Sequence, residues 1–185
     1  IIARREGNTL VVKADKGGEA EIYAGASGGI DNVAGVVVNA GDKVSVSAKD
    51  AHAWLGAEAF WGIYNSADVA IDADGVKVKA DGWDDTDAGI YADTWSGEYN
   101  TSSVALGGVG HKIGQGGVSV KAEDGAEAYI GAYAEGGHED AINDADVLIC
   151  TEGDVKVKAD GDYGCGHTGA YIEAIAMEGY QNNAS

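Results

Sequence analysis

Acidic residues gather in short glycine-containing segments of the chain, and they are the side chains best suited to hold a cation. Asp84, Asp85 and Asp87 stand close together in the segment 81–87, which also contains Gly82. Carboxylate oxygens are the ligands that calcium prefers, but the spacing is neither that of an EF-hand nor that of the calcium-binding nonapeptide of β-rolls. Two interpretations stay open: a weak calcium site at Asp84, Asp85 and Asp87, or a solvated turn. No other cofactor is expected.

The residues that could catalyse a reaction do not form a recognisable constellation. No histidine stands beside a serine or cysteine nucleophile together with a third group that would orient it. Cys165 and His167 would offer a metal two ligands, without a second pair. The chain is therefore predicted not to be an enzyme. The redox state of Cys150 and Cys165 stays open, because two cysteines do not indicate a compartment.

The charge of the chain argues against two classes of partner. Its 185 residues include 31 acidic and 12 basic residues, a formal net charge of -19, which repels nucleic-acid phosphates and anionic lipid headgroups. No apolar run approaches the roughly eighteen residues of a membrane-spanning helix, and the first residues lack the apolar region of a signal peptide. We therefore expect no nucleic-acid partner and no insertion into a membrane.

A strand-like segment recurs five times along the chain. In each copy the first, third and fifth residues are apolar, while the second and fourth are mostly lysine or serine. This period of two is typical of a strand with one buried face. The 30 glycines and the absence of proline fit many short, fully paired strands. The copies span residues 10–14, 44–48, 76–80, 118–122 and 155–159.

Two further segments follow the first in each repeat. The second places one aliphatic residue among small residues at alternate positions, and the third begins with valine and is aliphatic. Both patterns predict strands with their small and aliphatic residues buried. Copies of the second span 20–26, 53–59, 88–94, 128–134 and 170–176, and copies of the third span 36–38, 69–71, 104–106 and 147–149.

In every repeat, an asparagine occupies the same place in the turn that follows the second strand. An asparagine tolerates a left-handed backbone, and its side-chain amide is able to hydrogen-bond to the repeats on both sides. We therefore predict a ladder of stacked side chains formed by Asn32, Asn65, Asn100, Asn143 and Asn182.

Each repeat thus supplies three strands, and strands that pair with their own copies in the next repeat are parallel. The sequence predicts an all-β fold, a right-handed parallel β-helix or β-solenoid of about five coils, as a single domain over residues 1–185. These repeats resemble those of the filamentous-haemagglutinin-type adhesins and giant surface repeat proteins of bacteria. The resemblance lies in the pattern, and it implies a structural role at the cell surface or outside the cell.

The outward faces of the predicted strands carry two kinds of column. Lysines on the first strand either pair with an acidic face of a neighbouring filament or keep an exposed sheet soluble. Aromatic residues on the second strand either contact a partner or a glycan, or stabilise the sheet by stacking. The lysines are Lys13, Lys77, Lys79, Lys121, Lys156 and Lys158, and the aromatic residues are Tyr23, Trp54, Tyr91, Tyr129 and Tyr171.

The two ends of the sequence complete each other. Placing Ile1 after Ser185 restores the spacing between the turn asparagine and the aliphatic pair of the third strand. Residues 1–8 are therefore predicted to complete the last coil of a preceding unit. The units are either separate protomers or super-repeats of one covalent chain. The predicted end-to-end interface contains Ile1, Ile2, Ala3 and Asn182.

These observations predict a structural unit of an extracellular or cell-surface filament. A stack whose ends match without closing extends into a fibre, so the main partner of the chain is expected to be itself, head to tail. The alternative function is an adhesin-type binding module that engages glycans or calcium through its outward aromatic and acidic columns.

Overall fold

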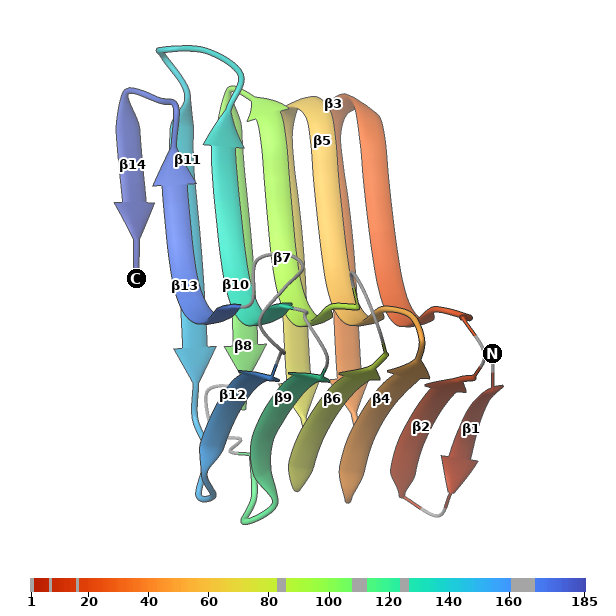
Figure 1. The fold of residues 1–185 in the computed structure, drawn as a ribbon. Coiled ribbons are helices and arrows are strands. Elements are labelled where there is room, and N and C mark those ends of the chain that lie inside the picture. Colours follow the sequence, from red (N-terminus) through yellow and green to blue (C-terminus); the bar gives the residue numbers. More distant parts are fainter. Residues whose placement is uncertain are drawn as a thin grey trace.

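The chain forms an all-β fold, seen in a computed structural model that describes residues 2–6 (backbone only), 8–15, 17–82, 86–107, 113–123, 127–160 and 169–185. None of the described segments is a helix of the length and apolarity that crossing a membrane requires. The strands form two sheets (Figure 1). The first sheet contains β1 (Ile2–Glu6), β2 (Thr9–Ala14), β4 (Lys43–Lys49), β6 (Gly75–Asp81), β9 (Gly117–Glu123) and β12 (Val155–Asp160), in this order.

The second sheet contains the remaining strands and folds back on the first. Its central strand β5 pairs with β3, β7 and β8, and the sheet continues through β10 to β13 on one side and through β11 to β14 on the other. These strands are β3 (Ala20–Asn39), β5 (Ala53–Asp72), β7 (Ala88–Gly97), β8 (Tyr99–Leu106), β10 (Glu127–Gly136), β11 (Ile142–Ile149), β13 (Gly169–Met177) and β14 (Gln181–Ala184).

Except for β1, the strands pair in parallel with their own copies in the next repeat. In the first sheet, Val44 of β4 stands opposite Leu10 of β2 and Val76 of β6. In the second sheet, Ala53 of β5 stands opposite Ala20 of β3 and Ala88 of β7. The all-β class and the parallel sheets predicted from the repeats are therefore confirmed.

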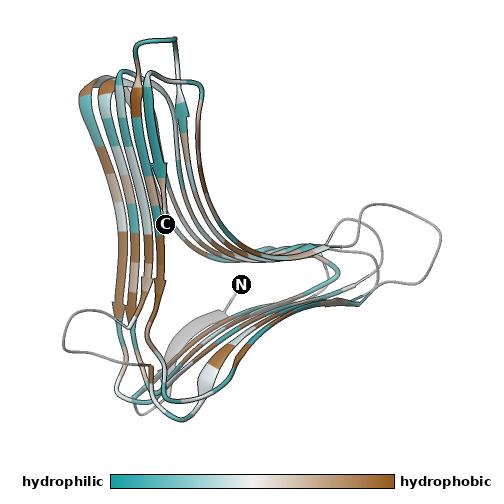
Figure 2. Cartoon of the chain, turned by 90° about the vertical axis from the view of Figure 1, so that its left-hand side faces the viewer, coloured by the Kyte–Doolittle hydropathy of each residue, from teal (hydrophilic) through white to brown (hydrophobic). Residues whose placement is uncertain are grey.

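One continuous core is enclosed by the first sheet and by the two halves of the bent second sheet, where β7 also packs against β8. In β4, Val44, Val46 and Ala48 are buried, while Ser45 and Ser47 between them are partly exposed. Seen along the direction of strand pairing, the repeats lie one behind another around this core (Figure 2). Burial of each large aliphatic side chain contributes on the order of 1.5–3 kcal/mol to folding. The alternation of the sequence thus matches the face of β4 that turns inward.

The strand boundaries differ from the three separate strands per repeat that the sequence predicted. The predicted second and third strands lie in the same sheet, and in β3 and β5 they merge into single strands of 20 residues. The merging occurs because pairing continues through the turn, where Gly29 stands opposite Gly62 and Asp31 opposite Tyr64. Later repeats interrupt the pairing, with a register shift between Glu135 and Gly136.

The predicted completion of a preceding unit's last coil by residues 1–8 stays a prediction. Within a single chain, β1 pairs antiparallel with β2, with Ile2 opposite Lys13 and Ala3 opposite Val12. The physical reason is that the outer edge of β2 offers unpaired backbone groups, and an adjacent segment can satisfy them through a tight turn. Ile1 lies outside the described residues.

Candidate functional site

The second sheet is bent, and the outer side of its β5, β7, β10 and β13 strands is concave (Figures 1 and 2). A groove of about 540 Å³ lies on this side, large enough for a small organic ligand. We call it the tyrosine–carboxylate groove. It is lined by Glu58, Asp87, Tyr91, Asp93, Glu127, Tyr129, Tyr133, Tyr171 and Glu173.

Glycines inside the strands create the room in which the tyrosine rings lie. A Cβ atom on Gly56 would come within 2.4 Å of the ring of Tyr91, and a Cβ atom on Gly89 within 2.5 Å of the ring of Tyr129. Both glycines take outward positions, since Gly56 is opposite Tyr91 and Gly89 is opposite Tyr129 on the neighbouring strand. The rings therefore lean across the glycine backbone instead of standing upright from the sheet.

Two tyrosines hold the carboxylate of Glu58 from the two neighbouring strands. The hydroxyl group of Tyr23 donates to Glu58 Oε2 at 2.8 Å, and that of Tyr91 donates to Oε1 at 3.1 Å. Burial, followed by the hydrogen bond to Glu58, raises the pKa of Tyr23 to about 12. Burial and the charge of Glu58 likewise raise the pKa of Tyr91. Both hydroxyl groups thus remain protonated donors.

Asp93 lies directly across the sheet from Glu58 and lacks such donors. Among the described residues, no hydrogen bond or ion pair reaches its carboxyl group. Burial, together with the negative charges of Glu58 and Glu135, raises the pKa of Asp93 to about 7. The groove therefore contains a carboxyl group that holds its proton to a higher pH than an ordinary aspartate does.

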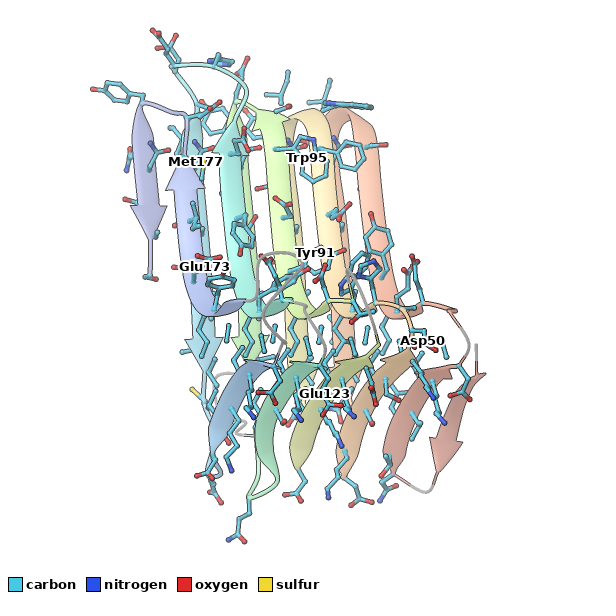
Figure 3. The ribbon with its side chains drawn as sticks, viewed as in Figure 1. Asp50, Tyr91, Trp95, Glu123, Glu173 and Met177 are labelled. Atoms are coloured by element: carbon cyan, nitrogen blue, oxygen red, sulfur yellow. The ribbon has the colours of Figure 1, made fainter. Side chains whose placement is uncertain are left out.

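The opposite part of the groove repeats the tyrosine–carboxylate contact. The hydroxyl group of Tyr133 donates to Glu173, and burial together with this bond raises the pKa of Tyr133. Figure 3 shows Tyr91 and Glu173 on the same outer side of the sheet. No hydrogen bond from the hydroxyl groups of Tyr129 and Tyr171 is found within the described ranges. Both tyrosines line the groove.

The predicted calcium site is only partly visible. Asp84 and Asp85 lie outside the described residues. Asp87 lines the groove, where its Oδ1 atom accepts a hydrogen bond from the backbone N–H of Glu127 at 3.0 Å. The described histidines, cysteines, aspartates and glutamates form no group of three that could hold a metal ion. Cys150 is a free thiol, and Cys165 and His167 lie outside the described residues.

The predicted aromatic columns lie on the outer face of the sheet, but their members differ in exposure. Tyr23 and Tyr171 are 44% and 40% exposed, whereas Tyr91 is only 8% exposed. Trp54 stacks on the ring of His52 with centroids 4.7 Å apart, and its Nε1 atom is buried without a hydrogen-bond partner in the described structure. Tyr91 and Tyr129 lie with centroids 6.1 Å apart. The columns therefore form a partly buried wall with exposed ends.

No pattern in the sequence predicted Glu58, Asp93, Tyr133 or Glu173 as site residues. All four occupy the alternate, outward positions of their strands. The available signal was the glycine at 56, 89 and 131, because glycine inside a strand marks a place where another group approaches the backbone.

The five turn asparagines form one hydrogen-bonded row. The Nδ2 atom of Asn32 donates to Oδ1 of Asn65 at 3.0 Å, and Asn65 donates in the same way to Asn100 at 2.9 Å. Asn100 donates to Asn143, and Asn143 donates to Asn182, each at 2.8 Å. The second N–H of each amide donates to a backbone carbonyl group. All the bonds along the row have the same direction.

The lysines of the first sheet are largely paired with carboxylates of that sheet. Lys79 lies 3.1 Å from Asp81 and 3.0 Å from Glu123, and Lys121 also contacts Glu123. These bonds hold the pKa of Glu123 below its usual value. Lys13, Lys156 and Lys158 each pair with an aspartate two positions away, and Lys77 is exposed. The column thus offers a neighbouring filament little uncompensated positive charge.

Comparisons with protein families, with curated proteins and with solved structures find no match to this chain. The function is therefore inferred from the geometry of the molecule.

Proposed function

We propose that the chain winds as a right-handed parallel β-helix and serves as a structural segment of an extracellular filament, stacked end to end on further copies. The winding is supported by the order of the strands, since each repeat contributes to the first sheet and then twice to the second before the next repeat begins. Parallel strands joined by crossover connections favour the right-handed path.

The observation that carries the proposal is the open face of the last repeat. Ile172 of β13 takes the inward position that Ile130 fills in β10, yet Ile172 is 51% exposed whereas Ile130 is fully buried. Val155 of β12 is likewise exposed, whereas its paired residue Val118 is buried. A further coil placed on this face would cover both side chains and pair the free edges of β12, β13 and β14.

The asparagine row gives the stacking a direction. Asn182 uses one N–H on the carbonyl group of Gly179, and its other N–H has no further asparagine among the described residues. At the opposite end, no donor within the described chain reaches Oδ1 of Asn32. A free donor at one end and a free acceptor at the other complement each other head to tail.

The predicted register also places residues 1–3 of the following copy. Pairing of β11 with β14 ends at Ala145 and Ala184, and Ser185 then donates a backbone bond to Ala145 and accepts one from Val147. Leu148 and Ile149 continue beyond it, and no backbone bond from that side reaches them in the described structure. Ile1, Ile2 and Ala3 of the next copy would pair with this edge. To do so, β1 must leave β2, which frees the edge of β2 for β12 of the preceding copy.

Sedimentation velocity across a concentration series, with electron cryomicroscopy of any assembled material, tests this proposal. We expect fibres whose axial unit is roughly 24 Å, from five coils spaced about 4.8 Å apart. Ile172→Lys places a charge on the stacking face and should leave the protein monomeric, because the charge would be buried between copies.

Ile63→Lys is the matched control, because Ile63 is also an exposed isoleucine, 38% exposed, but lies in the second repeat, away from both ends. This variant should assemble like the unaltered protein. A protein that stays monomeric at every concentration, or an Ile172→Lys variant that assembles normally, would overturn the proposal.

A further inference from the structure

The tyrosine–carboxylate groove has an uncompensated negative charge. Among the residues that the structure describes, its lining consists of five carboxylic side chains and four tyrosines, with neither lysine nor arginine. This contrasts with the first sheet, where Lys79 and Lys121 neutralise Glu123. Carboxylates that face one another without a cation repel, and a positively charged ligand would relieve this repulsion.

The carboxylates of the groove are held in different ways. Both oxygens of Glu58 accept hydrogen bonds from tyrosine hydroxyl groups, and one oxygen of Glu173 does so. Asp93, between them on the sheet, has no such donor among the described residues. The remaining acceptor atoms at Asp93 and Glu173 therefore call for a ligand that brings hydrogen-bond donors.

The tyrosine rings narrow the choice of ligand further. The face of an aromatic ring is negative and attracts a cation within about 6 Å of the ring centroid. The groove therefore combines ring faces with carboxylates, which both favour positive charge. A neutral sugar would stack on the rings but would leave the charge uncompensated. The described carboxylates also do not converge in threes as a metal ion requires.

We propose that the tyrosine–carboxylate groove binds an organic cation through alkylammonium groups, which contact the rings of Tyr129 and Tyr171 and the carboxyl groups of Asp93 and Glu173. The rings supply the cation–π contact, and the carboxyl groups accept the N–H donors. The groove lies on the outer side of the sheet, so binding does not depend on the proposed end-to-end stacking.

Isothermal titration calorimetry with spermidine, at fixed ionic strength, tests the site. We expect saturable binding to the unaltered protein and an affinity weakened about tenfold or more in the double variant Asp93→Asn/Glu173→Gln, which removes two acceptors of the ammonium group. Tyr171→Leu keeps the charge and should weaken binding by about two- to tenfold through loss of a ring face.

The control variant Asp42→Asn/Glu152→Gln removes the same two charges from exposed positions outside the groove, and it should bind spermidine within about twofold of the unaltered protein. A dilysine peptide serves as a second probe, because lysine side chains carry the same group. Binding of either probe with the expected loss in the groove variants supports the proposal. An equal loss of spermidine affinity in both double variants would mean that the cation is attracted by the overall charge of the protein, and this would overturn the proposal. Binding of a neutral disaccharide, with no binding of either cation, would also overturn the proposal.

Discussion

In the buried asparagine row, the side chain of a single residue such as Asn100 takes part in three hydrogen bonds. Asn100 accepts from Asn65 and donates to Asn143 and to the carbonyl group of Gly97, and it is 1% exposed. Replacing it by alanine leaves buried partners unsatisfied, so we expect Asn100→Ala to lower the free energy of unfolding by about 3 kcal/mol. Asn182→Ala, at the exposed end of the row, should cost less than half as much. Urea denaturation of both variants measures the difference, and equal losses would show that the row does not act through burial.

The titration of Asp93 is expected to make the free energy of unfolding depend on pH. Its pKa is raised to about 7 in the folded protein, mainly by burial, whereas an unfolded aspartate has a pKa of about 3.9. The folded state therefore holds the proton more tightly, and the stability that this provides is complete below about pH 4 and is lost as the pH rises through about 7. We expect Asp93→Asn to remove this loss, so that the variant gains stability relative to the unaltered protein between about pH 4 and pH 7. Urea denaturation across this range measures how the free energy of unfolding changes with pH, and Glu152→Gln serves as an exposed control. If the free energy of unfolding changes with pH in the same way for Asp93→Asn and for the unaltered protein, the pKa of Asp93 is not raised.

At the scale of the strand, the glycines of the second sheet are expected to act through the rings that lie across them. An alanine at position 89 would bring its Cβ within 2.5 Å of the Tyr129 ring, so we expect Gly89→Ala to destabilise the protein by about 1–3 kcal/mol. The same substitution should cost little in a Tyr129→Ala background, because the clashing ring is gone. Gly35→Ala in β3 is the control, since nothing lies within 4 Å of the added Cβ, and its effect should stay within about 0.5 kcal/mol. Thermal denaturation of the four proteins of the cycle gives the coupling, and its absence would mean that the ring moves aside freely.

Periodicity predicted most of the strands, because a repeat with alternating apolar residues leaves few ways to bury them. It did not predict that β3 and β5 would run through their turns, since that depends on backbone pairing between Gly29 and Gly62 and not on hydropathy. The sequence did not predict the tyrosine–carboxylate groove for a related reason. Tyr133 and Glu173 are ordinary outward residues in the sequence, and only the register of β10 and β13 brings them into contact. A glycine three positions before Asn32, Asn65, Asn100 and Asn182 was a further signal, because a side chain at Gly62 or Gly97 would strike the asparagine amides.

At the scale of the whole molecule, stability should fall from the middle of the stack toward its last repeat. Strands β6 and β7 have a parallel neighbour on both sides, whereas β12, β13 and β14 have one on a single side in the part of the chain that the structure describes. Because each repeat in such an array is stabilised mainly by its neighbours, we expect backbone amides of β13 and β14 to exchange with solvent faster than those of β7. Hydrogen–deuterium exchange read by mass spectrometry measures this gradient.

The same hydrogen-exchange measurement shows whether copies of the chain stay separate or stack end to end. If copies stack on the last repeat, raising the protein concentration should slow exchange in β13 and β14 while leaving β7 unchanged, because only the open face gains a neighbour. The net charge of -19 opposes this contact, so the effect should strengthen as salt shortens the Debye length to about 8 Å near 0.15 M. The Ile172→Lys variant should show the gradient at every concentration without the added protection. Exchange in β13 that is independent of both concentration and salt would mean that the open face recruits no second copy.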